Sequence, residues 1–117
     1  MYHSLLDEYE MEQQDKKRIV AILCEIKVKD EEIFNLLKKY CNIDPKETLA
    51  LIQNEKLINA PCRKLEEFLL LEKGYSIEEA DQFINKYAIG TLANNPELSK
   101  IAPDKLYIKV KEKNNIN

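Results

Sequence analysis

The segment NIDPKETLALI (42–52) carries the strongest helix-start signal in the chain, and the predicted architecture is built outward from it. Asp44 is a favoured N-cap residue, because its carboxylate can accept a hydrogen bond from a backbone amide of the first helical turn. Pro45 suits the first helical position, and Glu47 can reach back to the amide of the cap residue. The segment therefore predicts a turn followed by a helix at about 45–55.

The same order of residues returns 32 positions later in GYSIEEADQFI (74–84), where Ser76 stands in place of Asp44. Glu79 follows this serine by three residues, which completes a second capping signature. An apolar helical pattern precedes each turn, at 30–41 and at 62–73. The sequence thus predicts two similar helical hairpins.

Apolar residues recur at helical spacing along most of the chain, and two glycines and four prolines are too few for a sheet of tight hairpins. A further helix is predicted at about 15–27, and a short helical turn at 96–101. The predicted fold is an all-α, compact bundle of five to seven short helices. Its predicted core is Ile22, Leu23, Ile26, Ile33, Leu36, Leu37, Leu49, Ile52, Leu65, Phe68, Leu69, Phe83 and Ile84.

Charge divides the chain into three expected parts: an acidic N-terminal arm or short helix (1–14), a helical domain (15–102) and a basic tail (103–117). Residues 1–15 carry five acids and no lysine or arginine, whereas five lysines face two acids from position 100 onward. Apolar and polar residues alternate over 106–111, as in a strand. We therefore expect the tail to be extended or disordered.

The sequence offers no assembled chemistry, so a non-enzymatic protein without cofactor or metal is expected. It has no glycine-rich phosphate loop, no cluster with metal-ligand spacing and a single histidine, His3. The chain has an odd number of cysteines, Cys24, Cys41 and Cys62, and no two of them form a CxxC motif. This pattern favours buried, reduced thiols.

The N-terminal residues lack the basic and apolar regions of a secretory signal, and no apolar run approaches the roughly 18–20 residues that span a bilayer. A cytoplasmic protein without a membrane partner is expected by default.

A helix–turn–helix-like nucleic-acid-binding protein is the alternative function, in which lysine-rich ends contact phosphates. The candidate contacts are Lys16, Lys17, Arg18, Lys105, Lys109 and Lys111. Against this alternative, the helix after Ser76 exposes acids, and the chain has two arginines against sixteen lysines, although arginine dominates base reading. The repeated hairpin is therefore expected to build the fold rather than to read bases.

Surplus apolar residues favour protein binding instead. In LEEFLLLEK (65–73), Leu65, Phe68 and Leu69 suffice for one core face, whereas Leu70 and Leu71 project elsewhere. Such a helix is either central in the fold or presents a surface to a partner. We expect a small regulatory or adaptor protein that docks a helical surface onto another protein or onto its own copy. The candidate contacts are Phe68, Leu70, Leu71 and Leu51, with Lys64, Glu67 and Lys73 as a polar rim.

Overall fold

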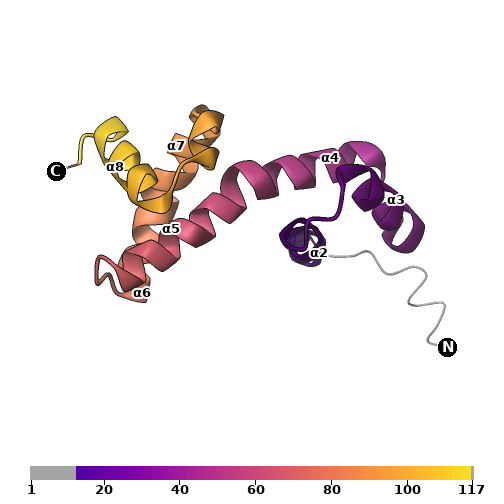
Figure 1. Cartoon of the computed structure of the whole chain (residues 1–117), viewed down its shortest axis with the longest axis horizontal. Helices are drawn as coiled ribbons and strands as arrows, with labels where there is room; N and C mark the ends of the chain where they lie inside the picture. The colour runs from indigo at the N-terminus through magenta and orange to yellow at the C-terminus, as the bar shows by residue number, and fades with distance from the viewer. Residues whose placement is uncertain (1–12, 117) are drawn as a thin grey trace. The chain divides into compact units, whose positions relative to one another are not determined.

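The computed structural model describes residues 13–116, and this part of the chain is helical without any strand (Figure 1). The α-helices are α2 (Gln13–Glu25), α3 (Asp30–Cys41), α4 (Pro45–Asn54), α5 (Ala60–Leu71), α6 (Ile77–Phe83), α7 (Ile89–Asn94) and α8 (Pro103–Lys113). Two π-helical turns, η1 (Glu55–Asn59) and η2 (Ile84–Ala88), and a 3-10 helix, η3 (Pro96–Lys100), connect some of them. The all-α prediction is confirmed. The N-terminal arm lies outside the described residues except for Gln13 and Gln14, which begin α2.

The chain divides after Ile52 into two compact units, here called the first unit and the second unit. Each unit has its own buried core. From the sequence, one helical domain was expected over residues 15–102. The division falls inside an unbroken helical run, because α4 passes through η1 into α5.

Pro61 explains why this run contains a π turn. Proline has no amide hydrogen, and in an α-helix its ring would collide with the carbonyl group four residues earlier. In η1 the amide of Ala60 instead bonds the carbonyl oxygen of Glu55, five residues back, which widens the turn just before Pro61. A proline at this position usually marks a helix boundary, but here the helical backbone continues through Pro61.

The first unit contains α2, α3 and α4 around six buried residues: Val20, Ile33, Leu37, Ile43, Leu51 and Ile52. Asp44 caps α4, since its Oδ1 accepts a hydrogen bond of 2.8 Å from the amide of Glu47. Glu47 does not return to the cap. Its carboxylate pairs with Lys16 Nζ at 2.7 Å, which ties α4 to α2.

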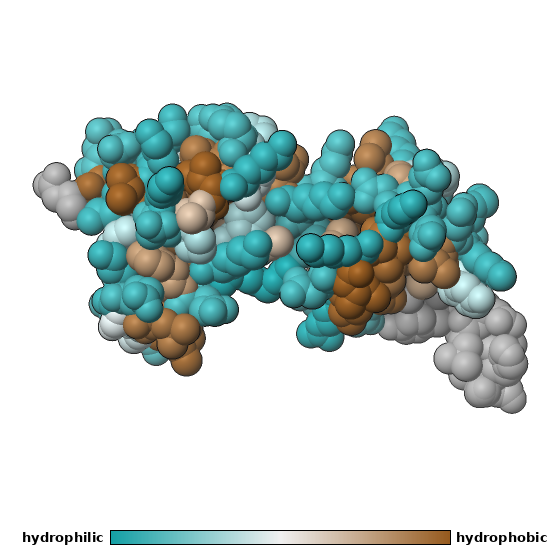
Figure 2. Space-filling view, viewed as in Figure 1, coloured by the Kyte–Doolittle hydropathy of each residue, from teal (hydrophilic) through white to brown (hydrophobic). Residues whose placement is uncertain are grey.

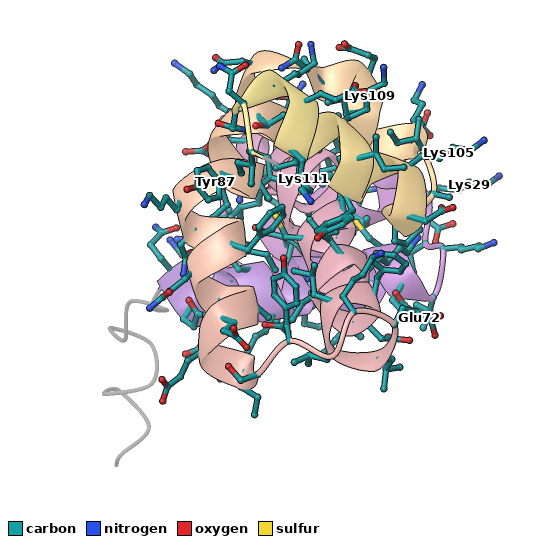
Figure 3. The ribbon with its side chains drawn as sticks, turned by 90° about the vertical axis from the view of Figure 1, so that its left-hand side faces the viewer. Lys29, Glu72, Tyr87, Lys105, Lys109 and Lys111 are labelled. Carbon is teal, nitrogen blue, oxygen red and sulfur yellow. The ribbon has the colours of Figure 1, made fainter. Side chains whose placement is uncertain are left out.

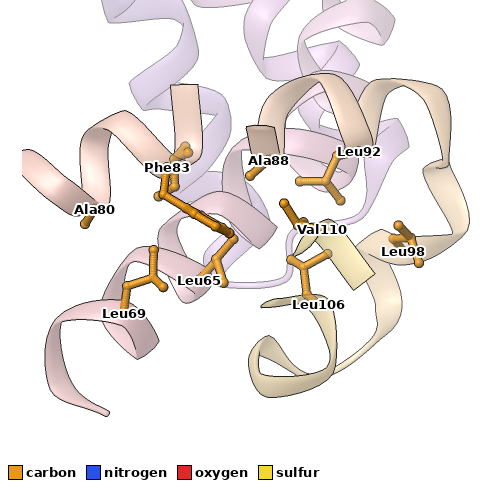
Figure 4. Close-up of a cluster of buried hydrophobic side chains, with 10 residues drawn as sticks. Leu65, Leu69, Ala80, Phe83, Ala88, Leu92, Leu98, Leu106 and Val110 are labelled. Atoms are coloured by element: carbon orange, nitrogen blue, oxygen red, sulfur yellow. The ribbon is translucent and has the colours of Figure 1, made fainter. Parts of the chain in front are cut away.

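The second unit contains α5 to α8 around ten buried side chains (Figure 4): Leu65, Leu69, Ala80, Phe83, Ile84, Ala88, Leu92, Leu98, Leu106 and Val110. Here the capping box is complete. Ser76 Oγ accepts from the amide of Glu79 at 3.1 Å, and the carboxylate of Glu79 accepts from the amide of Ser76 at 2.9 Å.

The two hairpins, α3–α4 and α5–α6, have the same design, as predicted. Asn42 ends α3 in the left-handed conformation, and Gly74 occupies the same conformation after α5. The next amide then bonds a carbonyl oxygen six residues earlier, Ile43 to Leu37 at 3.1 Å and Tyr75 to Leu69 at 3.0 Å.

Four residues of the predicted core are wrong: Ile22, Ile26, Leu36 and Leu49 are exposed. Among the described residues of the first unit there are three helices, and each buries a narrower face than its apolar stripe. Val20 and Ile43, the latter from the turn, occupy core positions instead.

The structure also corrects the prediction for the tail: Pro103–Lys113 forms helix α8 and is not an extended or disordered segment. Leu106 and Val110 are buried, and Ile108 between them is half exposed. The alternating pattern misled because residues four apart share a side of a strand and also a face of a helix. Asn114 closes α8 by donating to the carbonyl oxygen of Val110 and to Thr91 Oγ1, each at 2.8 Å.

Candidate protein-binding site

A pocket opens on the surface of the second unit where the C-terminal half of α5 meets the start of α8. We call it the α5–α8 pocket; its volume is about 260 Å³, and it is lined by Lys64, Glu67, Phe68, Leu71, Glu72 and Pro103. The lining combines an aromatic ring, an aliphatic side chain and a proline with charged groups of both signs. This combination is typical of sites that bind an apolar side chain within a polar rim.

The predicted contact residues fall into different surroundings. Leu71 is 73% exposed at the pocket, and Phe68 is partly buried in its wall. Leu70 packs against the core of the second unit, and Leu51 is 7% exposed in the core of the first unit. The structure thus brings Phe68 and Leu71 together and removes Leu70 and Leu51 from the candidate surface.

An aromatic cluster holds Phe68 in place below the pocket. The ring of Tyr107 lies 5.8 Å from that of Phe68 and 5.4 Å from that of Phe83, measured between centroids. Tyr75 completes this packing at 6.1 Å from Phe83, and its hydroxyl lies 3.1 Å from the hydroxyl of Tyr107. This hydrogen bond is the main cause, and burial the second cause, of a rise in the pKa of Tyr75 to about 12, so the phenol stays neutral.

Two lysines approach the same cluster. The ammonium group of Lys73 lies 5.3 Å from the ring centroid of Tyr107, and that of Lys111 lies 5.1 Å from it. Both distances are within the range of cation–π attraction. The rings below the pocket are therefore fixed by packing, a hydrogen bond and two cations.

The six lysine and arginine residues proposed for nucleic acid occupy both units. In the first unit Lys16 is bound to Glu47, while Lys17 and Arg18 are exposed. In the second unit Lys105 and Lys109 lie on the exposed side of α8, and Lys109 is 3.6 Å from Glu112 (Figure 3). Lys16, Lys109 and Lys111 thus already have partners within the chain.

Three further polar side chains, those of Glu55, Cys62 and Glu66, lie in η1 and α5. Glu55 is buried, with 3% of its surface exposed, and both its carboxylate oxygens accept from the guanidinium group of Arg63, one of them at 3.2 Å. Burial raises the pKa of the Cys62 thiol to about 11, which suppresses the reactive thiolate. Burial and a hydrogen bond with Asp81 raise the pKa of Glu66.

Within residues 13–116, no group of three or more histidine, cysteine, aspartate or glutamate side chains is placed to hold a metal ion. Each helix in that range is too short or too polar to cross a bilayer. Comparisons of the chain with protein-family models, with curated proteins and with solved structures find no match.

Sequence reasoning missed two residues of the pocket, Glu72 and Pro103. Glu72 lies just beyond the end of α5, within the quoted apolar stretch, and could have been included with the rim. Pro103 is 32 residues from Leu71, and no local pattern in the sequence indicates that the start of α8 packs beside α5.

Proposed function

We propose that this chain is a small, non-enzymatic regulatory or adaptor protein that binds another protein through the α5–α8 pocket. The observation that carries the proposal is Leu71, an aliphatic side chain that is 73% exposed beside a pocket with an aromatic wall. A partner would place one large apolar side chain between Phe68, Leu71 and Pro103. The energy of such a contact comes mainly from a few well-packed apolar groups that lose water.

The surroundings of the pocket support this mode of binding. Phe68 is held by Tyr107 and by the cluster beneath it, so little side-chain entropy is lost when a partner binds. Lys64, Glu67 and Glu72 offer both signs of charge at the rim and would select the orientation of the partner.

The test is affinity purification of the tagged full-length chain from its native cell, with nuclease treatment and identification of proteins by mass spectrometry. Leu71→Asp should abolish capture of the specific partner, whereas Ile108→Asp should retain it. Ile108 is a matched control because it is exposed in the same unit and does not line the pocket. Circular dichroism should show that both variants stay folded, since exposed substitutions usually change stability by about 0.5 kcal/mol or less. Equal capture by Leu71→Asp and wild type would refute the proposal.

Nucleic-acid binding is the weaker proposal, because Lys16 and Lys111 have partners within the chain. The same purification tests it without the nuclease step. Co-purifying nucleic acid that is lost on reversal of Lys105 and Lys109, but kept in Leu71→Asp, would favour it over protein binding.

A further inference from the structure

The outer face of α2 carries an apolar stripe that the other described residues of the first unit leave partly exposed. Ile22 and Ile26 are 60% and 65% exposed, whereas Ile19 beside them is partly buried and packs against the core of the first unit. Ile26 follows the last residue of α2, but its amide still bonds the carbonyl oxygen of Ile22 at 3.0 Å, so the stripe continues through it. Figure 2 shows hydrophobic surface in the region where Figure 1 places α2.

The spacing of this stripe is that of a helix that pairs with another helix. Ile19, Ile22 and Ile26 are separated by three and then four residues, the alternation found at the contact positions of a coiled coil. Leu23, on the neighbouring face, packs into the core of the first unit and holds α2 in place. The stripe therefore sits on an anchored helix.

Two charges flank the stripe. Arg18 and Glu25 are seven residues apart, so they lie on the same side of the isoleucines, and both are exposed. Arg18 comes no nearer than 3.8 Å to Asp15, and its side chain is 70% exposed, so this contact is weak.

We propose that α2 pairs with the α2 of a second copy of this chain in the antiparallel direction, about a two-fold axis close to Ile22. The axis places Ile22 against its own copy and brings Ile19 within one residue of level with Ile26 of the copy. It also brings Arg18 of each copy within one residue of level with Glu25 of the other, on the same flank. Because the interface is isologous, this charge pair forms twice. In a parallel pair the two copies of this flank would lie on opposite sides of the interface, so Arg18 would lose its contact with Glu25. Charge complementarity thus selects a second copy in the antiparallel direction.

The paired assembly extends the function proposed above without depending on it. Each copy carries one α5–α8 pocket, so two copies carry two, and a partner with two binding segments would gain avidity from their shared attachment. Because one short helix per copy supplies the contact, the interface is small, and a dissociation constant on the order of 10–100 μM is expected.

Sedimentation equilibrium of the full-length chain between about 10 μM and 1 mM, a range set by that affinity, tests the pairing. The wild type should shift from monomer to dimer across this range. Ile22→Ser should raise the dissociation constant at least about tenfold, as expected for loss of a central apolar contact. Ile108→Ser, an exposed isoleucine of the second unit, should leave the constant unchanged.

A charge exchange tests the direction of the pair. Arg18→Glu and Glu25→Arg should each weaken the dimer, because each places like charges together, and the combined variant should restore it. A chain that is monomeric at every concentration would overturn the proposal, and this is the outcome expected if another segment or a foreign partner covers the stripe. A dimer that is indifferent to Ile22→Ser, or a combined variant no stronger than the single ones, would also overturn it.

Discussion

The packing of α8 can be tested by comparing Leu106→Ala with Ile108→Ala. Leu106 is 1% exposed among the side chains of the second-unit core, whereas Ile108 is 53% exposed two residues away on the same helix. Truncating Leu106 removes three buried carbons, which is worth roughly 2.4 kcal/mol, and the cavity left behind raises the expected loss to about 3 kcal/mol. Truncating Ile108 should change the unfolding free energy by less than about 0.5 kcal/mol.

Urea denaturation followed by circular dichroism at 222 nm measures both losses, with the slopes of the transitions compared to the wild type. Since about 3 kcal/mol is a large share of the stability of a small domain, Leu106→Ala should clearly lower the transition midpoint. Both variants carry alanine within a helix, so differences in helix propensity stay small. If the two variants differ by less than about 0.5 kcal/mol, a margin typical of surface sites, then α8 is not packed and the tail is extended or disordered.

Three further predictions concern local features. Asp44→Ala should lower the unfolding free energy by about 1 kcal/mol in urea denaturation, because α4 loses its cap, and no change would mean that the cap bond is not made in solution. Gly74→Ala should lower the unfolding free energy by about 1 kcal/mol, because its backbone is left-handed (φ 68°). Gly90→Ala, inside α7, should instead raise the unfolding free energy by roughly 0.5–1 kcal/mol. Equal effects of the two substitutions in thermal unfolding would contradict this. The raised pKa of Glu66 stabilises the fold below the ordinary pKa of glutamate and loses this effect as pH rises through the folded value. Glu66→Gln should therefore gain in melting temperature relative to wild type from pH 4 to pH 7, and a difference constant with pH would refute the raised pKa of Glu66.

Local signals predicted the helices well, because caps and apolar spacing act within a few residues. Asp44 and Ser76 begin helices as expected, and the left-handed residue before each of them closes a hairpin of the predicted design. The tail could not be settled in this way, since the four-residue spacing of Leu106 and Val110 fits a strand and a helix equally. Only packing against the second-unit core distinguishes the two.

Long-range contacts explain the other differences. The division after Ile52 has no marker in the sequence because it lies within a continuous helix. Leu70 and Leu71 are adjacent in the sequence, yet one packs inward and the other is exposed, depending on where α8 lies. The sequence therefore predicted part of the α5 side of the pocket. Pro103, which lines the pocket from α8, could be identified only from the structure.

The unbroken helical run from Pro45 to Leu71 serves two cores at once, and this links their stabilities. Starting a helix is costly, while extending one that already exists adds a hydrogen bond for each residue fixed. Once either core has ordered its end of the run, the other core extends an existing helix and avoids the cost of nucleation. Conversely, loss of either core frays the helix on which the other is built. The two units thus have separate buried side chains but draw on one helical segment of backbone.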